Sequence, residues 1–279
     1  RCTVAIAGGS CIHLPTSGYL YEPDSIYSPI GQCAPFDALA NGIVLGDSVC
    51  AIVLKLAGRA VIHRDCIRAL IKSCIVNNNG SVRGAASFAA PNAIAQAECI
   101  PGALREANVN ATDIVYVEGH GTGTVVGDPI EVEGLTLAFD TFQRQYCVLG
   151  SVKFNVGHTD TAADLVGLIK TALILQHRYI PATLNYRSSN PNIDFSSTPF
   201  VVRSTGVSLK TARFEHGPLL AGVSSLGMGR TNAHAILQKY RSALSSKNSY
   251  DSSENAVHQV TLSSKTPESL QAYLREVIH

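Results

Sequence analysis

The stretch from Val117 to Glu131, VEGHGTGTVVGDPIE, constrains the fold of this 279-residue chain more than any other part of it. An apolar strand ends near His120, a loop of glycines and threonines follows, and Pro129 stands where the first turn of a helix begins. Strands that alternate with helices build α/β folds, and these folds place their site residues at the C-terminal ends of strands. The stretch therefore predicts an α/β fold with a functional site around His120.

The rest of the chain supplies further strands and helices for such a core. Apolar runs predict buried strands over residues 2–7, 48–56, 67–76, 113–117, 147–150, 219–225 and 233–237. Apolar spacing and helix-start residues predict helices over residues 91–107, 128–139 and 158–177. Residues 13–47 are rich in Pro, Gly, Ser and Asp and predict a long irregular loop segment. Near the C-terminus, a polar linker over 241–258, a strand over 259–263 and an amphipathic helix over 267–278 are expected.

Particular residues are expected to end or cap these elements. Gly8 and Gly9 should end the first strand, and Asp128 should cap the helix that follows the opening stretch. Pro101 should kink or split its helix, because proline lacks the amide hydrogen that a helix interior uses. The sequence NNNG, which starts at Asn77, should end the strand before it. Two buried helical stripes are expected, one of Ile94, Ala97, Ile100 and Leu104 and one of Ala162, Leu165, Ile169 and Leu173.

The composition argues against some classes of function. With a net charge of +1 and no cluster of Lys and Arg, the sequence predicts no nucleic-acid partner. It contains no uninterrupted apolar stretch of about 20 residues, so no transmembrane helix and no membrane partner are expected. The N-terminus lacks the plan of a signal peptide and an initiator Met, which suggests a sequence that starts within a fold.

The eight cysteines show no CxxC pair and no metal-ligand cluster in their spacing. Most of them lie in apolar runs, as Cys50 does in SVCAIVLKL and Cys74 in IKSCIV. Buried free thiols in a reducing cytoplasm are therefore expected, with disulfides as the less favoured alternative. A zinc site built from His120, His158 and a cysteine stays open, although no HxxxH or HxH pair supports it. The sequence thus predicts no metal site.

Two later stretches change how His120 is interpreted. In GSVKFNVGHTDTAADLVGLIK, Lys153 and Asn155 precede His158, which is expected at the start of a helix. A helix N-terminus disfavours an imidazolium, so His158 is expected to be neutral and to donate a hydrogen bond to a developing oxyanion. In GVSSLGMGRTNAHAIL, the amides of a glycine turn could face an oxyanion, and Asn232 could brace that turn.

Each of these features taken alone has an ordinary structural explanation. His120 can be a histidine satisfied by a backbone carbonyl, Lys153 a solvated loop lysine, and the glycine turn part of a plain β-hairpin. A phosphate-binding loop is not supported, because GHGTGTVVG lacks the Gly-Lys-Ser/Thr ending and does not fit GxGxxG. No GxSxG elbow of a serine hydrolase stands out.

The motifs taken together resemble one known family. HGTGT–GDPIE, KxNxGH and GVSSxGxGxTNAH occur in this order, and SPIGQCAPFDALANG and VNNNG with APNAIAQ lie upstream of them. Over about residues 1–238 this set resembles the β-ketoacyl synthase (ketosynthase) domains of modular type I polyketide synthases. The run from Ser17 to Tyr21 looks most like synthases whose acyltransferase acts in trans, and LSSKTPESL is similar to the start of the linker after such domains.

The resemblance implies a thiolase-like, layered αβαβα fold, of which this chain holds the C-terminal half and the end of the N-terminal half. Residues 1–110 would be the end of the N-terminal ketosynthase half with a dimer and loop segment. Residues 111–240 would be the C-terminal half, and residues 241–279 a linker or the start of another domain. The implied partners are an acyl carrier protein, a second copy in a homodimer, and neighbouring synthase domains.

The implied activity is decarboxylative Claisen condensation, in which malonyl-carrier protein extends an acyl chain held as a cysteine thioester. No directly bound cofactor is implied, because the substrates travel on the phosphopantetheine of the acyl carrier protein. The two histidines would bind the malonyl thioester carbonyl and stabilise the enolate, as an oxyanion hole does. The implied catalytic residues are His120, His158 and Lys153, and the implied substrate-binding residues are Thr122, Thr124, Asn155, Leu226 and Gly227.

The sequence departs from the family pattern at several positions. The family's nucleophilic cysteine lies in a DTACSSSL-like elbow, and none of the eight cysteines here has that context. Leu226 replaces a usual Phe, Arg230 a glycine of the GxGGTN turn, and Asp164 a usual Gly. A side chain at Arg230 is expected to strain the turn, and the Asp164 carboxylate needs a partner or solvent. The alternative function is therefore a degenerate, non-catalytic scaffold or carrier-protein docking domain, and the chain alone is expected not to condense substrates.

Overall fold

The computed structural model describes residues 2–14, 18–23, 25–78, 92–211, 217–241, 264 and 266–278. The chain divides into two compact units, Arg1–Tyr240 and Arg241–His279. In the second unit the expected amphipathic helix is confirmed as α6 (Pro267–Ile278). The expected strand over 259–263 and nearly all of the expected linker over 241–258 lie outside the described residues, as do Ser17, Asn79, Gly80 and Pro91.

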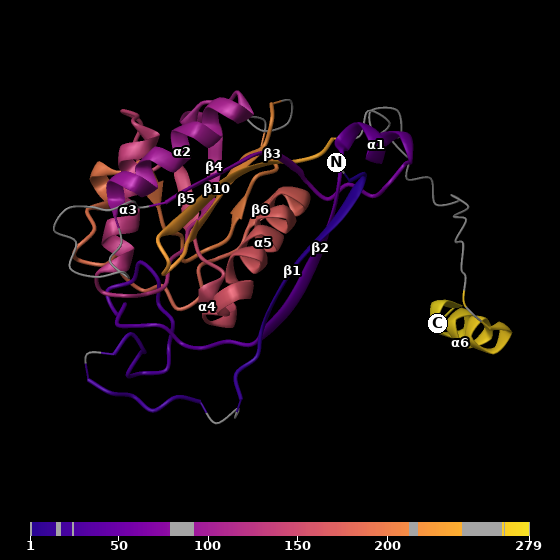
Figure 1. Ribbon diagram of the computed structural model, residues 1–279, viewed down its shortest axis with the longest axis horizontal. Coiled ribbons are helices and arrows are strands. Elements are labelled where there is room, and N and C mark those ends of the chain that lie inside the picture. The colour runs from indigo at the N-terminus through magenta and orange to yellow at the C-terminus, as the bar shows by residue number, and fades with distance from the viewer. Residues whose placement is uncertain are drawn as a thin grey trace. The chain divides into compact units, whose positions relative to one another are not determined.

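A six-stranded mixed sheet forms the centre of the first unit (Figure 1). Its strand order is β3-β10-β9-β4-β5-β7, in which β4, β5, β7 and β9 run parallel and β10 runs antiparallel to both β9 and β3. The strands are β3 (Leu70–Asn78), β4 (Ile114–Glu118), β5 (Cys147–Gly150), β7 (Phe200–Val201), β9 (Leu220–Leu226) and β10 (Thr231–Gln238). Parallel strands with helical crossovers are buried on both faces, and every residue of β4 is buried.

Helices cover both faces of this sheet. The helices α2 (Ala93–Ala107) and α3 (Gly127–Phe139) pack against one another, and α2 lies on β3 and β10. The helix α5 (Ala163–His177) contacts β9, β4 and β10. The strand β4 contributes side chains to both resulting cores, because Val117 packs in the cluster that contains Leu135 of α3, whereas Tyr116 packs with Leu175 of α5. The predicted α/β fold is confirmed.

The first two strands lie outside the central sheet, as an antiparallel pair of β1 (Val4–Cys11) and β2 (Ser48–Lys55). The prediction of a short buried strand ended by Gly8 and Gly9 was wrong, since β1 continues through both glycines and its residues are alternately exposed. The pair contacts α5 and the 3-10 turn Asp160–Ala162. Its other face carries apolar side chains that are largely exposed, such as Ile6 at 76%.

The remaining short elements connect these parts. Residues 25–47 contain isolated bridges and turns, as the predicted irregular segment requires. The short elements are α1 (Ala57–Ile62), α4 (Lys153–Val156), the antiparallel pair β6 (Tyr179–Ile180) and β8 (Val207–Ser208), and 3-10 turns at Ala111–Asp113 and Phe195–Ser197. No described helix combines the length and the apolarity needed to cross a membrane.

Several predicted helix details were wrong. The helix α2 continues through Pro101 to Ala107 and is capped at its start by the Asn92 side chain, which accepts from two backbone amides. The residue that caps α3 is Val126, not Asp128, and it offers no side-chain hydrogen bond. The prediction for α5 placed its start at His158, five residues before the observed helix, because a 3-10 turn intervenes.

The predicted buried stripes of the helices and the predicted burial of the cysteines also need correction. Ile94 is 66% exposed and Leu173 is 47% exposed, so neither lies on a buried face. The residues that α5 buries are Ala163, Gly167, Thr171, Ile174 and Leu175, because α5 is packed between the sheet and the β1–β2 pair. All eight cysteines are free, but Cys50 is only half-buried and Cys74 is exposed. Their apolar strands each have one face turned to solvent.

The turn between β9 and β10 gives a first testable prediction. Arg230 has a φ of 67°, the left-handed region that costs a side chain about 1–2 kcal/mol. Arg230→Gly should therefore stabilise the chain by about 0.5–1 kcal/mol and raise Tm by about 2 °C. Met228→Gly is the matched control, because Met228 lies in the same turn but does not have a positive φ. This substitution should leave Tm unchanged or lower it. A lower Tm for Arg230→Gly would contradict the strain.

The exposed face of the β1–β2 pair gives a second prediction. Ile6 and Val53 are register partners and are 76% and 71% exposed. Contiguous exposed apolar surface promotes association, so the chain should self-associate as its concentration rises. Ile6→Thr combined with Val53→Thr keeps β propensity and should reduce this self-association. The measurement is the molar mass from light scattering coupled to size exclusion. Leu20→Thr, at a 91% exposed position in a loop, is the control. A monomeric wild-type chain at all concentrations would refute the prediction.

Candidate active site

Two carboxylates of α3 hold the loop that carries His120. Glu131 accepts hydrogen bonds from the backbone N–H of His120 at 2.6 Å and of Gly121 at 2.7 Å. Asp128 accepts from Gly123 N–H at 3.0 Å and from Phe36 N–H at 2.6 Å. Both carboxylates are buried. A buried carboxylate needs such partners, so these hydrogen bonds fix the path of the loop against α3.

Glycines allow this path where other residues would not. Gly123 has a φ of 74°, which a side chain adopts only at a cost. A Cβ on Gly121 would lie 2.8 Å from the Cβ of Ser151 and 2.9 Å from Cζ of Phe36. Glycine is therefore required at these positions by close packing against Ser151 and Phe36 and by the positive φ of Gly123.

Lys153 is a structural anchor of the same loop. It is buried, with 2% of its surface exposed, and its Nζ donates to the carbonyl oxygen of His120 at 2.6 Å. The explanation of Lys153 as a solvated loop lysine is therefore wrong. Its position in the first turn after β5 places a fixed positive charge directly behind His120.

His158 lies beside His120, with ring centroids 5.6 Å apart and an interplanar angle of 83°. The prediction that His158 starts a helix was wrong, because it follows α4 and precedes the 3-10 turn. Its backbone is instead paired with residues of the long irregular segment. His158 N–H donates to the carbonyl of Val44 at 2.7 Å, and its own carbonyl accepts from Gly46 N–H at 3.0 Å.

His158 is neutral, as predicted, but for a different reason. Burial, together with the positive charge of Lys153 and the proximity of His120, lowers the pKa of His158 to about 4. Its Nδ1 accepts a hydrogen bond from the backbone N–H of Asp160 at 3.1 Å. A neutral imidazole carries one proton, so the proton of His158 is on Nε2. Nε2 of His158 is therefore the ring nitrogen that can donate a hydrogen bond to a ligand.

Asp164, a partly buried carboxylate, has a hydrogen-bond partner on each of its two oxygens. Its Oδ1 lies 3.3 Å from Nδ1 of His120, and its Oδ2 accepts a hydrogen bond from the hydroxyl of Ser225. Burial raises the pKa of Asp164, but the hydrogen bond from His120 and the charges of His120 and Lys153 outweigh burial. The net result is a pKa lowered to about 2. Asp164 is therefore a carboxylate at neutral pH, and Nδ1 of His120 donates to it.

The two threonines lie together in the loop after His120. Their hydroxyl oxygens are 3.2 Å apart, and that of Thr124 also accepts from Gly127 N–H at 3.1 Å. Both side chains are half-buried, so part of each stays accessible to a ligand. Asn155, by contrast, is exposed on α4, and its described hydrogen bond is a backbone one to Val152.

Near the C-terminal end of β9, Ser225 reaches the site through its hydrogen bond to Asp164. Gly227 N–H donates to Thr231 O at 2.8 Å and Arg230 N–H donates to Gly227 O at 2.9 Å, so these two amides do not face an oxyanion. Leu226 lines a small pocket together with His234, and neither His120 nor His158 is among the lining residues of that pocket. Nδ2 of Asn232, the residue expected to brace the turn, donates to Oδ1 of Asn77 on β3 at 2.9 Å.

Sequence reasoning missed some residues that support the site. Asp128 and Glu131 stood in the opening stretch, but their bonds to loop amides have no signature in spacing alone. The buried Glu118 accepts from Val152 N–H, from Tyr116 and from Lys170, whose Nζ is 3.0 Å away, and so ties β4 to α4 and α5. Such residues become visible only when the strands are placed side by side.

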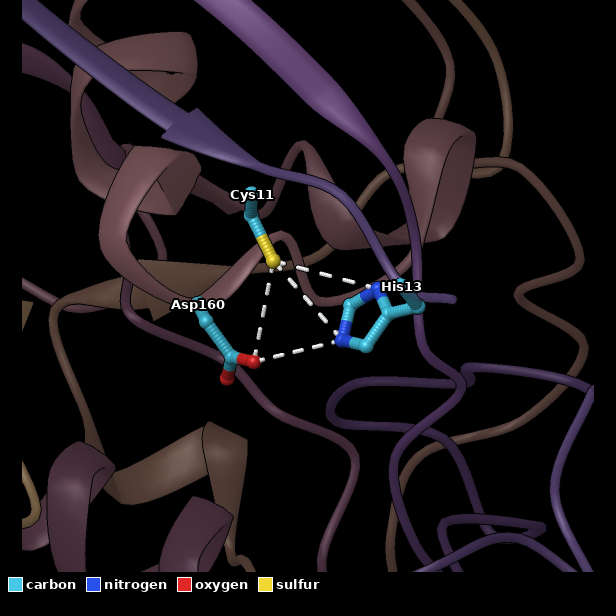
Figure 2. A group of neighbouring side chains, drawn as sticks. All are labelled: Cys11, His13 and Asp160. Atoms are coloured by element: carbon cyan, nitrogen blue, oxygen red, sulfur yellow. Dashed lines mark hydrogen bonds and ion pairs between the residues drawn. The ribbon is translucent and has the colours of Figure 1, made fainter. Parts of the chain in front are cut away.

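A group of potential metal ligands is the other feature that the sequence did not reveal. The sequence spacing predicted no metal-ligand cluster, yet the structure brings together Cys11, His13 and Asp160, as Figure 2 shows. The third residue is 149 positions away from the first, which is why no local motif reveals the group. Among the described contacts of the eight cysteines, none is a hydrogen bond to His120 or His158.

Comparisons with known families cover almost the whole chain. Residues 1–60 match the β-ketoacyl synthase N-terminal domain, residues 68–187 match the β-ketoacyl synthase C-terminal domain, and residues 190–279 match the ketoacyl-synthetase C-terminal extension. The HGTGT and KxNxGH motifs both fall within the C-terminal domain match.

Curated relatives are polyketide synthases. One phenolphthiocerol/phthiocerol polyketide synthase protein of Mycobacterium tuberculosis is 44% identical over 244 residues, which are 86% of this chain and 16% of that protein. Polyketide synthase PksN of Bacillus subtilis is 37% identical over 277 residues, 98% of this chain and 5% of that protein. The chain therefore spans only a small part of the length of either relative.

Solved ketosynthases share the fold. Ketosynthase twelve of the bacillaene polyketide synthase of Bacillus amyloliquefaciens matches with a TM-score of 0.81 and 41% identity, over 86% of this chain and 42% of that one. The ketosynthase of module 6 of the bacillaene synthase of Bacillus subtilis matches with a TM-score of 0.81 and 33% identity, over 99% of this chain and 47% of that one. These matches confirm the thiolase-like fold. The chain therefore belongs to the β-ketoacyl synthase family, as a ketosynthase domain of type I polyketide synthases, a group that includes the trans-acyltransferase type.

Proposed function

We propose that this chain supplies the malonyl-binding half of a ketosynthase active site and acts in polyketide chain elongation by decarboxylative Claisen condensation. The observation that carries the proposal is the pair of histidine rings 5.6 Å apart, one of which has its proton on Nε2. Two imidazoles that converge in this way suit the oxygen of a thioester carbonyl, where negative charge develops during decarboxylation.

In the proposed reaction the malonyl thioester carbonyl accepts a hydrogen bond from Nε2 of His158. The bond between the malonyl methylene carbon and its carboxylate breaks, carbon dioxide leaves, and the electron pair moves into the enolate. The enolate carbon then attacks the acyl thioester on the catalytic cysteine. A carbon–carbon bond forms, the carbon–sulfur bond breaks, and the cysteine leaves as the thiolate.

His120 acts as the second ligand of the carbonyl oxygen in this proposal. Its Nδ1 faces the Asp164 carboxylate, so its Nε2 is the nitrogen left for the substrate. Lys153 supports His120 through the bond from Nζ to the backbone carbonyl of His120, and it is a positioning residue in this site. Preorganised groups of this kind lower the barrier without reorganising during the reaction.

The same proposal assigns the substrate carrier and the partners. The malonyl and acyl groups arrive on the phosphopantetheine of an acyl carrier protein, and the half-buried hydroxyls of Thr122 and Thr124 are placed to contact that arm. Asn155, Leu226 and Gly227 complete the proposed substrate-binding set. A homodimer within a larger synthase and a cytoplasmic location are also proposed, the latter supported by eight free cysteines.

The catalytic cysteine is proposed to come from outside these 279 residues. Cys33 is the cysteine nearest to the loop of His120, since its Sγ lies 3.6 Å from the carbonyl of Thr122. Burial, with a smaller contribution from the Asp128 charge, raises the pKa of Cys33 to about 11. A thiol with such a pKa is a poor nucleophile at neutral pH, so Cys33 does not replace the missing group.

A non-catalytic scaffold or carrier-protein docking domain is the second candidate. The replacement of a usual glycine by Arg230, which has a left-handed φ, and of a usual Phe by Leu226 favours this candidate, because both depart from the family pattern. Asp164 favours neither candidate function, because its carboxylate has hydrogen-bond partners. A condensation assay on a complete ketosynthase domain that contains residues 1–240 separates them.

His120→Ala and His158→Ala provide the direct test in that complete domain. Loss of one hydrogen-bond donor to an oxyanion costs about 100- to 1,000-fold in rate, so each variant should lower malonyl decarboxylation and condensation by that factor. Transfer of an acyl group onto the cysteine should survive in both. The measurement is product mass together with acyl-enzyme mass. Wild-type rates in both variants would refute the roles assigned to the two histidines, whereas no condensation by an acylated wild-type domain would leave the scaffold as the function.

Asp164→Asn tests whether the carboxylate beside His120 helps the reaction. The amide keeps an acceptor for His120 but removes the charge, and a charge-assisted hydrogen bond contributes about 1.5–3 kcal/mol. We expect kcat for condensation to fall about 10- to 100-fold while KM for malonyl-carrier protein stays within about twofold. The matched control is Asp140→Asn, at an exposed position after α3. An unchanged kcat would show that Asp164 serves only to satisfy its own burial.

A further inference from the structure

The end of β1 lies unusually close to the turn before α5. A Cβ on Gly9 would sit 2.9 Å from Cα of Ala162 and 2.9 Å from the carbonyl oxygen of Thr161, so only glycine fits there. Thr161 also donates its hydroxyl hydrogen to the carbonyl of Ser10 at 2.6 Å. These contacts hold the two segments together and bring the side chains that follow on β1 next to Asp160.

Three different ligand types meet at this junction, as Figure 2 shows. The Sγ of Cys11 lies 3.8 Å from Oδ2 of Asp160 and 3.7 Å from Nε2 of His13. The third side of the triangle, from Nε2 of His13 to Oδ2 of Asp160, is 3.5 Å. A point at the centre of such a triangle is about 2.1 Å from each atom, which is within the range of zinc–ligand bonds of about 2.0–2.3 Å.

A second carboxylate orients the histidine. Asp47 Oδ1 lies 2.8 Å from Nδ1 of His13 and also accepts the backbone N–H of His13 at 2.9 Å. Metal-bound histidines almost always donate their other ring N–H to a carboxylate or carbonyl, which fixes the tautomer. With the proton of Nδ1 directed at Asp47, Nε2 keeps the lone pair that an ion can use, and this nitrogen lies 3.5 Å from Oδ2 of Asp160.

An ion pair alone does not account for the whole arrangement. An imidazolium at His13 between Asp47 and Asp160 would explain those three residues, and the hydrogen bond to Asp47 does raise the pKa of His13. It leaves Cys11 unexplained, since a neutral thiol adds little to an ion pair. Burial and then the charge of Asp160 raise the pKa of Cys11. A cation at the centre would reverse that effect and make the sulfur the strongest ligand of the set.

We propose that Cys11, His13 and Asp160 form a binding site for a zinc-like divalent ion, with Asp47 as the residue that orients His13. One thiolate, one imidazole and one carboxylate match the ligands that zinc takes from proteins, and three protein ligands leave a fourth position for water. All three ligands are partly solvent-accessible, so an ion can enter without opening the fold.

The site would join two segments that are distant in sequence. Cys11 and His13 belong to β1 and the residues after it, whereas Asp160 belongs to the turn whose amide bonds Nδ1 of His158. A bound ion would therefore cross-link the β1–β2 pair to the backbone beside His158. This inference stands apart from the proposed catalytic role, because metal binding is measured without any turnover.

Cobalt(II) is the probe for the test, because thiolate-bound cobalt has a charge-transfer band in the near ultraviolet and tetrahedral cobalt has intense visible bands. The 279-residue chain, stripped with a chelator under reducing conditions, is titrated with cobalt(II) and then with zinc(II). We expect both sets of bands to rise to one equivalent and then to disappear as zinc displaces cobalt, since zinc binds such ligands more tightly.

Variants assign the ligands. Cys11→Ser should abolish the charge-transfer band, and His13→Gln and Asp160→Asn should each weaken cobalt binding at least tenfold. Asp47→Asn should keep the band but weaken binding about 10- to 100-fold, as an orienting residue does. Cys66→Ser is the control, because Cys66 is an exposed cysteine outside the group. Circular dichroism and Tm without metal verify that each variant is folded.

Three results would overturn the proposal. The first is the absence of a thiolate band with up to one equivalent of cobalt. The second is a band that persists in folded Cys11→Ser or vanishes in Cys66→Ser, which would place the ion at another cysteine. The third is equal cobalt affinity for wild type and for folded His13→Gln and Asp160→Asn, which would leave the group as an ion pair with a neighbouring thiol.

Discussion

The hydrogen bonds from buried carboxylates of α3 to loop amides are the interaction on which the rest of the site depends. Without Glu131 and Asp128, the loop after β4 would leave several backbone N–H groups unpaired in the interior, each at a cost of about 1–3 kcal/mol. The carboxylates in turn could not remain buried without those amides. Each partner thus requires the other, and His120 is positioned as a consequence.

Around this loop, a positive, a negative and a neutral side chain surround His120. Lys153 lies behind His120, the Asp164 carboxylate lies on its Nδ1, and neutral His158 lies opposite its ring. Lys153 lowers the pKa of both His158 and Asp164, which keeps the first without charge and the second ionised. Burial is the larger cause of the lowered pKa of His158, and the hydrogen bond from His120 contributes more than Lys153 to the lowered pKa of Asp164.

The sequence allowed much of this to be predicted where the determinants are local. The bounds of β5 and α6 were predicted to the residue, and the strand before His120 nearly so, because apolar runs end at clear polar or glycine boundaries. The pairing of His120 with His158 was inferred from motifs. Local pattern failed where long-range packing decides, as at Ile6, whose strand has a solvent-facing side, and at Pro101, which α2 accommodates.

Parts of the site could not be predicted because their partners are distant in sequence. Nothing near Asp164 indicates Ser225, and nothing near Cys11 indicates Asp160. The neutral state of His158 was predicted from a helix dipole that is not there. The physical cause is instead burial beside Lys153, which only the packed structure supplies.

The backbone pairing of His158 with Val44 and Gly46 has a consequence for how the molecule assembles. This pairing closes a loop of more than a hundred residues, and closing such loops costs chain entropy that must be recovered by later contacts. His120, by contrast, is held by Glu131 only 11 positions away. The two histidines therefore belong to contacts of very different range, and the second forms only after the irregular segment has docked. The pairing of His158 therefore costs more chain entropy than the hydrogen bond that holds His120.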